Sequence, residues 1–325
     1  MVRQRNYKRL HKVYKKVFIP TIQPLSPFTS LSILMKLCDK KAIIIVLWIA
    51  LQTFTFGLIS LRHCRGGVVY DIGFNHGQDT LNYLKMNYCV VAVEANPFLA
   101  KLGRDSDIFR PYLALGRLVL VDKLIMEGPS KTVPFYVHLL NDEWSSFHKS
   151  DGCRNASYFN SGVEKLCDEI QVMSTSCHAL FQEFGVPFYL KVDIEGNDRN
   201  CLNDLLLQPS SELPKYVSVE AGTIQNIHLL FRAGFTMFKV VNQEFRGVLG
   251  DSSGPFGEFA RDVLTNMKWQ TYAEIVQVFK EFEHLHISNH TDLRNACRDV
   301  KNNCWYDFHA TTAIDFNTPL RSSRN

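Results

Sequence analysis

The stretch "VVYDIGFNHGQDTLNYL", residues 68–84, predicts a strand, a tight turn and a helix. Its apolar run ends at Asp71, and apolar residues then recur at helical spacing. Gly73 and Gly77 would let a ligand approach the backbone and the N–H groups of the helix start, although an ordinary tight turn would use them too. The spacing fits neither the GxGxxG fingerprint nor a P-loop, and the strand-end carboxylate disfavours phosphate. We therefore expect a cationic or hydroxyl-rich ligand.

A second strand, "VVAVEANP" at residues 90–97, carries an acid suited to such a ligand. Glu94 follows Gly73 by 21 residues, where a carboxylate can accept hydrogen bonds from both ribose hydroxyls. The alternative is a surface acid at a strand end. A nucleoside with a positive charge and no phosphate, such as S-adenosylmethionine, fits both segments. Gly73 and Gly77 would then make room for its methionine part, while Asp71 would support the loop.

The third segment is "YLKVDIEGNDRNCL", residues 189–202. Lys191, Asp193 and Glu195 alternate along a strand and could point the same way. Ligands of open α/β sheets bind at the carboxyl ends of strands. Asp193 could orient the acceptor or act as general base, and Glu195 could bind the acceptor or cap the next helix. An ordinary capping acid beside a solvated one is the alternative.

Together with "VSVE" at residues 217–220, these segments resemble the FkbM-type methyltransferases in motif and order. These enzymes use S-adenosylmethionine and mostly O-methylate hydroxyls of sugars or natural products. The resemblance covers roughly residues 68–241. It implies a Rossmann-like, seven-stranded sheet with one reversed edge strand, and it marks Asp193, Glu195 and Gly196 as a second signature. By motif position, it implies cofactor contacts at Asp71, Gly73, Asn75, Gly77, Thr80 and Glu94. One departure is Phe74, which stands where the family often has a small residue and could narrow the cofactor cleft.

Further candidate cofactor contacts lie in two turns. Asn96 follows the second strand, and Ser145 and Ser146 lie in the polar loop "NDEWSSFHKSDG". The resemblance favours this Ser-Ser segment near the adenosyl end, although it also fits an ordinary loop.

Proton transfer needs a base near the acceptor. Asp193 is the first candidate, with Glu220 and His309 as alternates, although a lone His is more often structural. We expect no metal, because no Cys or His cluster has a zinc-site spacing. A divalent cation on Asp193, Glu195 and Glu220 is the alternative, since carboxylates suit Mg²⁺, Mn²⁺ or Ca²⁺.

From residue 67 onward, short apolar runs alternate with helical patterns. This alternation predicts an α/β fold, a doubly wound and mostly parallel sheet with helices on both faces. Continuous apolar runs fit strands buried on both sides. We place this domain at residues 66–325, with a C-terminal helical extension from about residue 257.

An uncharged apolar run at residues 42–61 is long enough to cross a bilayer. Residues 1–41 hold ten Lys or Arg and one acid, which predicts a cytoplasmic, largely disordered tail before a transmembrane signal anchor and a lumenal remainder. A cleaved signal peptide and a buried core helix are the alternatives. Removing this tail from the totals leaves 26 basic and 31 acidic residues, so the domain is mildly acidic and nucleic acid is a poor partner.

The cysteines agree with a lumenal domain, because eight of the nine follow the apolar run. Cys153 with Cys167 and Cys297 with Cys304 are candidate local disulfides, whereas Cys89 and Cys201 look like buried thiols. Two glycosylation sequons, at residues 155–157 and 289–291, add weak support.

The sequence thus predicts an O-methyltransferase of the Golgi or ER, held as a single-pass type II membrane protein and acting on a glycan or another hydroxyl compound. Two alternatives stay open. One is a nucleotide-sugar glycosyltransferase that uses Asp193 and Glu195 as a metal site. The other is a catalytically silent, membrane-anchored binding module. The oligomeric state stays open too.

Overall fold

The computed structural model describes residues 64, 66–155, 165–220, 224–242, 269–277, 280 and 306–312. The chain divides after Ile59 into two units, and all the described residues belong to the second. The predicted tail and the predicted span lie outside them. Within the described part, no helix combines the length and the apolar character that crossing a membrane needs.

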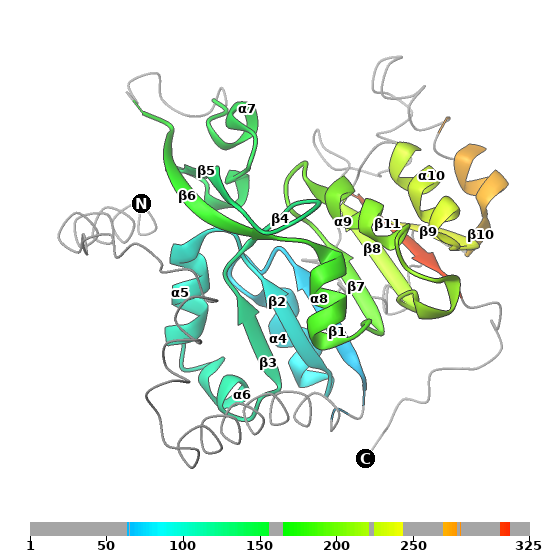
Figure 1. Cartoon of the computed structure of the whole chain (residues 1–325), viewed down its shortest axis with the longest axis horizontal. Helices are drawn as coiled ribbons and strands as arrows, with labels where there is room; N and C mark the ends of the chain where they lie inside the picture. The colour runs from blue at the N-terminus through cyan, green and yellow to red at the C-terminus, as the bar shows by residue number, and fades with distance from the viewer. Residues whose placement is uncertain are drawn as a thin grey trace, which may run out of the picture. The chain divides into compact units, whose positions relative to one another are not determined.

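The domain is built on a sheet of eight strands in the order β10-β9-β11-β8-β7-β1-β2-β3 (Figure 1). The strands are β1 (Val68–Ile72), β2 (Cys89–Val93), β3 (Leu118–Val121), β7 (Tyr189–Val192), β8 (Tyr216–Glu220), β9 (Met237–Asn242), β10 (Gln270–Thr271) and β11 (Tyr306–Thr311). From β3 to β8 all neighbours are parallel, whereas β11 is antiparallel to both β8 and β9. The α/β fold with a mostly parallel sheet is confirmed.

The expected reversed edge strand is not at an edge. The reversed strand β11 lies between β8 and β9, and the two-residue β10 adds an eighth strand outside them. Both come from the stretch in which a C-terminal helical extension was expected, where the described residues 272–277 are helical. β11 belongs in the sheet because Phe308 and Ala310 are buried in its core while its backbone pairs on both sides.

Apolar clusters cover both faces of the sheet. The helices are α4 (Gln78–Lys85), α5 (Pro97–Asp105), α6 (Arg110–Ala114), α7 (Lys149–Gly152), α8 (Cys177–Phe184), α9 (Asp198–Leu205) and α10 (Ile224–Ala233), with 3-10 turns η1 (Asp142–Trp144) and η2 (Ser210–Glu212). Tyr70 of β1 packs with α8, α9 and α10, whereas its neighbour Val69 packs with Tyr83 and Leu84 of α4. Successive strand residues thus enter opposite cores, which explains the continuous apolar runs.

A smaller sheet lies between β3 and α8 in sequence. It has the order β4-β6-β5, from β4 (Leu124–Ile125), β5 (Thr132–His138) and β6 (Cys167–Thr175). Leu124, Val133 and Phe135 form its apolar cluster. In Figure 1 it lies with α7 beyond the carboxyl ends of β1, β2 and β3. It therefore covers the edge at which open α/β sheets bind ligands.

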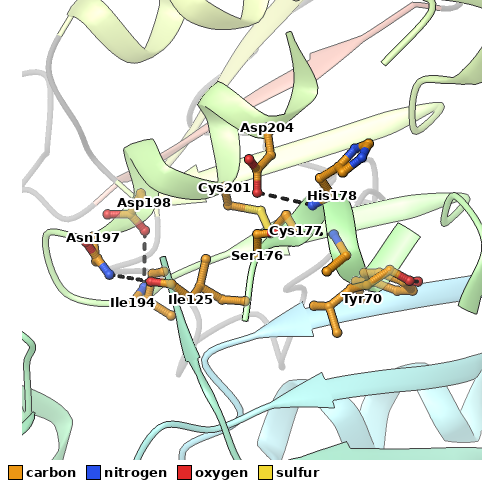
Figure 2. The surroundings of a disulfide bond; sticks show 12 residues. Tyr70, Ile125, Ser176, Cys177, His178, Ile194, Asn197, Asp198, Cys201 and Asp204 are labelled. Carbon is orange, nitrogen blue, oxygen red and sulfur yellow. Dashed lines mark hydrogen bonds between the residues drawn. A yellow bond between two sulfur atoms is a disulfide. The ribbon is translucent and has the colours of Figure 1, made fainter. Parts of the chain in front are cut away.

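Three disulfides join described cysteines. Cys153–Cys167 confirms one predicted pair, while Cys297 and Cys304 lie outside the described residues. The expectation of free thiols was wrong, because Cys89 pairs with Cys64 and Cys201 pairs with Cys177. Figure 2 shows the last pair joining the start of α8 to α9. Its partners are 24 residues apart, so only the packing of the two helices reveals it.

Candidate active site

A cavity of about 350 Å³ opens at the carboxyl ends of the central parallel strands. Gly73 and Asn75 line it after β1, and Glu94 lines it after β2. Asp193 and Glu195 follow β7, and Glu220 ends β8. Parallel strands place these loops along one edge, so residues far apart in sequence meet around one space. Phe135, Ser145 and Phe147 line it from the smaller sheet and the loop after it.

Gly73 allows the loops after β1 and β7 to pack against each other. Its φ of +101° favours glycine, and a Cβ there would lie 1.9 Å from the carbonyl oxygen of Asp193. Its N–H donates to the carbonyl oxygen of Val93, at 3.0 Å. Gly73 is therefore required by backbone packing at the wall of the cavity.

Glu94 is held in a fixed position by two backbone donors. The N–H of Asn75 donates to one carboxylate oxygen at 2.8 Å, and the N–H of Asn96 donates to the other at 2.7 Å. Burial raises the pKa of Glu94 to about 7, against the lowering effect of these two hydrogen bonds. Each oxygen keeps a further acceptor site. The Asn96 side chain caps α5 by accepting from the N–H of Phe98, and it does not line the cavity. Asn96 thus positions Glu94.

Lys191 connects the floor of the site to Asp193. Its ammonium lies 3.4 Å from Asp71, 2.9 Å from Asp79 and 3.3 Å from Asp193. Burial alone would lower the pKa of Lys191, but these carboxylates raise it well above its usual value. Burial raises the pKa of Asp71, whose carboxylate also accepts from the Thr80 hydroxyl at 2.6 Å. Asp71 and Thr80 do not line the cavity, so they support the loop from below.

The acceptor side of the cavity carries acids with raised pKa values. Burial, aided by Asp193, raises the pKa of Glu195 to about 7, while Arg154 opposes it from 3.6 Å. Burial and the neighbouring Asp193 and Glu195 raise the pKa of Glu220 to about 9. At neutral pH Glu220 is therefore protonated and can donate a hydrogen bond, which makes it a poor general base.

The loop after β7 is fixed by the start of α9. Asp198 accepts from the N–H of Ile194 at 3.1 Å, and the Asn197 side chain donates to the carbonyl oxygen of Ile125 at 2.6 Å (Figure 2). These two hydrogen bonds tie the turn that carries Asp193 and Glu195 to the start of α9 and to the smaller sheet. They hold Glu195 in a left-handed backbone conformation, with a φ of +50°.

The loops that build this cavity also carry the similarity to known proteins. Residues 71–242 match the methyltransferase FkbM domain, which is more than half of the 325-residue chain. The chain belongs to the FkbM methyltransferase family. It is a methyltransferase with S-adenosylmethionine as methyl donor, which excludes the glycosyltransferase alternative.

Two solved structures align with most of this chain, and the alignment covers most of each of them as well. One is a precorrin-6y C5,15-methyltransferase from Geobacter metallireducens GS-15, with 10% identity, a TM-score of 0.33 and coverage of 81% of this chain and 87% of that one. The other is the [4+2]-cyclase SpnF, with 10% identity, a TM-score of 0.32 and coverage of 81% and 82%. At these scores neither likeness bears on function. No curated protein matches.

The cavity of this FkbM domain fits S-adenosylmethionine. The side-chain oxygen of Asn75 is buried and has no hydrogen-bond partner within the described part of the chain. An unpaired buried acceptor costs about 1–3 kcal/mol, so a donor of the ligand is favoured there. Glu94 offers the acceptor sites that a ribose diol needs. The lining is also strongly acidic, which suits a sulfonium, and it contains Asp79, Glu94, Asp142, Glu143, Asp193, Glu195 and Glu220 beside Lys123 and Lys191.

The role expected of Gly77 in the FkbM motif has to be corrected. Gly77 does not line the cavity, and a Cβ there would lie 2.5 Å from ring atoms of Phe74 and Phe109. It precedes α4 with a φ of +77° and makes room for these rings. Phe74 is 2% exposed and packs edge-on against Phe109, with 5.4 Å between ring centroids. Phe74 thus lines the cavity, but most of its ring packs in the core and leaves the cavity open.

His309 was also misplaced by sequence reasoning. It lies within β11, opposite Ser218 of β8 and Lys239 of β9, and does not line the cavity. Burial, together with Lys239, lowers its pKa to about 3. A buried imidazole of this pKa is a poor general base at neutral pH.

Ser145 and Ser146 have different tasks. Ser145 lines the cavity, and its hydroxyl accepts from the N–H of His138 at 3.1 Å. Ser146 is buried, and its hydroxyl donates to the carbonyl oxygen of Glu195 at 3.1 Å. The predicted pair thus comprises one cavity residue and one that positions the loop after β7.

Sequence reasoning missed the acids of η1. Asp142 and Glu143 line the cavity from the turn just before Ser145. Asp142 also lies 3.1 Å from the His76 imidazole, which joins η1 to the β1–α4 loop. The polar loop was recognised, and its two consecutive acids were the available signal. Among the described residues, no group of three or more His, Cys, Asp or Glu side chains is arranged to hold a metal ion.

Proposed function

We propose that this FkbM methyltransferase methylates a hydroxyl of an uncharged glycan or of another neutral compound of the secretory pathway. The observation that carries the proposal is the charge of the cavity. Its lining has seven acids and two lysines, and it stays negative with Glu220 protonated. Lys191 is already engaged by three carboxylates. Lys123 is the one other cation among the described residues of the lining, so an anionic acceptor would meet mostly like charge, which costs binding energy. A neutral sugar avoids this cost, and its hydroxyls can be matched by carboxyl groups.

The residues of the cavity have distinct roles in this reaction. When bound, S-adenosylmethionine supplies a methyl group on a positively charged sulfur. Glu94 would hold its ribose, and the Asn75 side chain would accept from a donor of the same ligand. Asp193 would accept the proton of the acceptor hydroxyl while Lys191 orients its carboxylate. Protonated Glu220 would donate a hydrogen bond to the acceptor. Positioning the acceptor oxygen in line, about 3 Å from the methyl carbon, is the main catalytic contribution.

Placement in the lumen of the Golgi or ER, as a single-pass type II protein, is part of the proposal. The three described disulfides support an oxidising compartment. The basic tail and the apolar run at residues 42–61 support a signal anchor with this orientation.

The test uses the full chain, made in a secretory host, with isotope-labelled S-adenosylmethionine and matched pairs of glycans. Each pair has the same neutral core with and without a sialic acid or sulfate. Mass spectrometry is expected to find one labelled O-methyl group on the neutral member and at least about tenfold less on the anionic one. Asp193→Asn should abolish the product and keep S-adenosylhomocysteine binding. Equal methylation of both members, or methylation of nitrogen, would overturn the proposal.

A further inference from the structure

An aromatic row lies at the amino-terminal edge of the sheet, opposite the cavity. We define it as Tyr88, Phe188, Tyr216 and Trp269, all of them half-buried. Neighbouring ring centroids are 6.0, 5.4 and 6.3 Å apart along this order. Tyr88 and Phe188 directly precede β2 and β7, and Tyr216 begins β8. Four rings from separate segments thus form one continuous surface feature.

Cations accompany the aromatic row. The exposed Lys215 places its ammonium 5.9 Å from the centroid of Phe188 and 5.6 Å from that of Tyr216. Lys239 lies 5.8 Å from the Trp269 ring. Rings beside cations are typical of surfaces at the level of lipid headgroups, where rings meet the apolar boundary and cations meet phosphate.

Exposed aliphatic side chains gather at the same edge. Seven large hydrophobic residues are exposed in the described part, and four of them lie in the connections that lead into strands or helices at this edge. They are Met86, Ile108, Leu115 and Leu207, with exposures of 40, 57, 67 and 64%. The acid Glu212 also lies on this edge and offsets part of the positive charge. We therefore assign the attraction of this edge for a lipid surface first to its apolar area and second to its charge.

The chain enters the described domain at this edge. A Cβ on Gly66 would lie 2.8 Å from the Tyr88 ring, and one on Gly67 would lie 3.2 Å from Phe188. Gly66 follows the predicted span, which ends at residue 61, by five residues. Five residues reach at most about 18 Å. The disulfide Cys64–Cys89 further ties this entry point to the start of β2.

We infer that this edge is a membrane-contact surface, and that its occupant is the lumenal headgroup layer of the bilayer that holds the predicted anchor. The inference rests on the proposed membrane placement. Because the cavity opens at the other end of the same strands, contact at this edge directs it away from the bilayer. The acceptor would then be a hydroxyl that reaches the enzyme from the lumen, and not one at the depth of the lipid headgroups.

The experiment places the photo-crosslinker p-benzoylphenylalanine at Leu115 or, as control, at Met173 in the full chain. Met173 is a matched control, because it is 47% exposed and lies on β6 in the smaller sheet. Each protein is reconstituted into vesicles of phosphatidylcholine with one fifth phosphatidylserine, irradiated and analysed by mass spectrometry. Lipid adducts are expected at position 115 at least tenfold above position 173. Equal labelling, or protein–protein adducts in place of lipid adducts at 115, would overturn the inference.

Two further measurements separate the possible failures. A chain that does not float with the vesicles overturns this inference and the anchor together, whereas a floating chain without selective labelling overturns this inference alone. Lys215→Glu should lower labelling at 115 at least threefold. Lys149→Glu is its control, because Lys149 is also exposed and lies 6.0 Å from a ring, that of Tyr136 beside the smaller sheet. Equal effects of the two substitutions would contradict the inference.

Discussion

Glu94 is the residue whose ionisation is expected to govern cofactor affinity. Its two oxygens are oriented by the backbone of Asn75 and Asn96, and burial raises its pKa to about 7. Only the ionised carboxylate accepts from both ribose hydroxyls and from both backbone donors. The acid that sequence spacing indicated is therefore held in an environment where modest pH changes alter its charge.

Glu94→Gln is expected to weaken binding of S-adenosylhomocysteine about 10- to 100-fold, because hydrogen bonds to a charged group contribute about 1.5–3 kcal/mol. In the wild type, affinity should rise as pH rises through about 7, and in the variant this rise should be absent. Isothermal titration calorimetry from pH 6 to 8 measures both. Glu143→Gln, at another acid of the cavity lining, should keep the rise. If Glu94→Gln binds S-adenosylhomocysteine as tightly as the wild type, Glu94 does not hold the ribose.

At the scale of elements, the junction between the loops after β1 and β7 shapes the site. Gly73 faces the backbone of Asp193, and Asp193 is in turn paired with Lys191 of β7. Any side chain at position 73 must therefore displace the strand end that carries the proposed base. The cavity depends on this contact between two elements that are far apart in sequence.

Gly73→Ala tests this junction. The added Cβ would lie 1.9 Å from a carbonyl oxygen, so we expect a loss of roughly 3 kcal/mol in the free energy of unfolding and at least tenfold weaker cofactor binding. Gly128→Ala separates the clash from backbone strain, because Gly128 also has a positive φ, +83°, but nothing lies within 4 Å of its Cβ position. Chemical denaturation compares the two. If both variants lose the same free energy of unfolding, the positive φ alone explains the loss and the proposed clash with Asp193 is contradicted.

At the scale of the whole molecule, the sheet edge concentrates buried acids. Glu94, Glu195 and Glu220 have pKa values raised to about 7, 7 and 9, mainly by burial. Between about pH 4.5 and 9 these three glutamates hold more protons in the folded protein than in the unfolded chain, where glutamates ionise near pH 4.3. This excess outweighs the single proton that His309, with its pKa lowered to about 3, gives up on folding. The free energy of unfolding of the cofactor-free protein should therefore fall as pH rises through this range.

Thermal unfolding at pH 5, 7 and 9 measures this effect. Glu220→Gln should raise the midpoint by roughly 2–6 °C at pH 9, corresponding to ~1–2 kcal/mol, and change it little at pH 5. The exposed Glu183, on α8 away from the cavity, provides the control substitution Glu183→Gln. An unfolding midpoint that is constant or rises from pH 5 to 9 would show that these buried glutamates do not destabilise the folded protein when they ionise.

Local pattern was sufficient for much of the fold. Apolar runs and helical spacing predicted a mostly parallel sheet, because strands buried on both faces must be continuously apolar. The same pattern failed for β11, which was read as part of a helical extension. Its place between β8 and β9 depends on pairing with strands that precede it by about 90 and 70 residues. The disulfide partners Cys177 and Cys201 were missed for the same reason, since their helices meet only in the folded domain.

The sequence by itself determined the family, the cofactor and the acids at the strand ends, because each motif combines a turn with the side chain that the turn presents. Only the tertiary structure decided which of these residues reach the cavity. It placed Gly73 at the cavity and Gly77 away from it, packed most of the Phe74 ring in the core beside the cavity, and buried His309 in mid-strand. The physical reason is that side-chain direction and burial depend on neighbours from distant segments, and no local spacing encodes them.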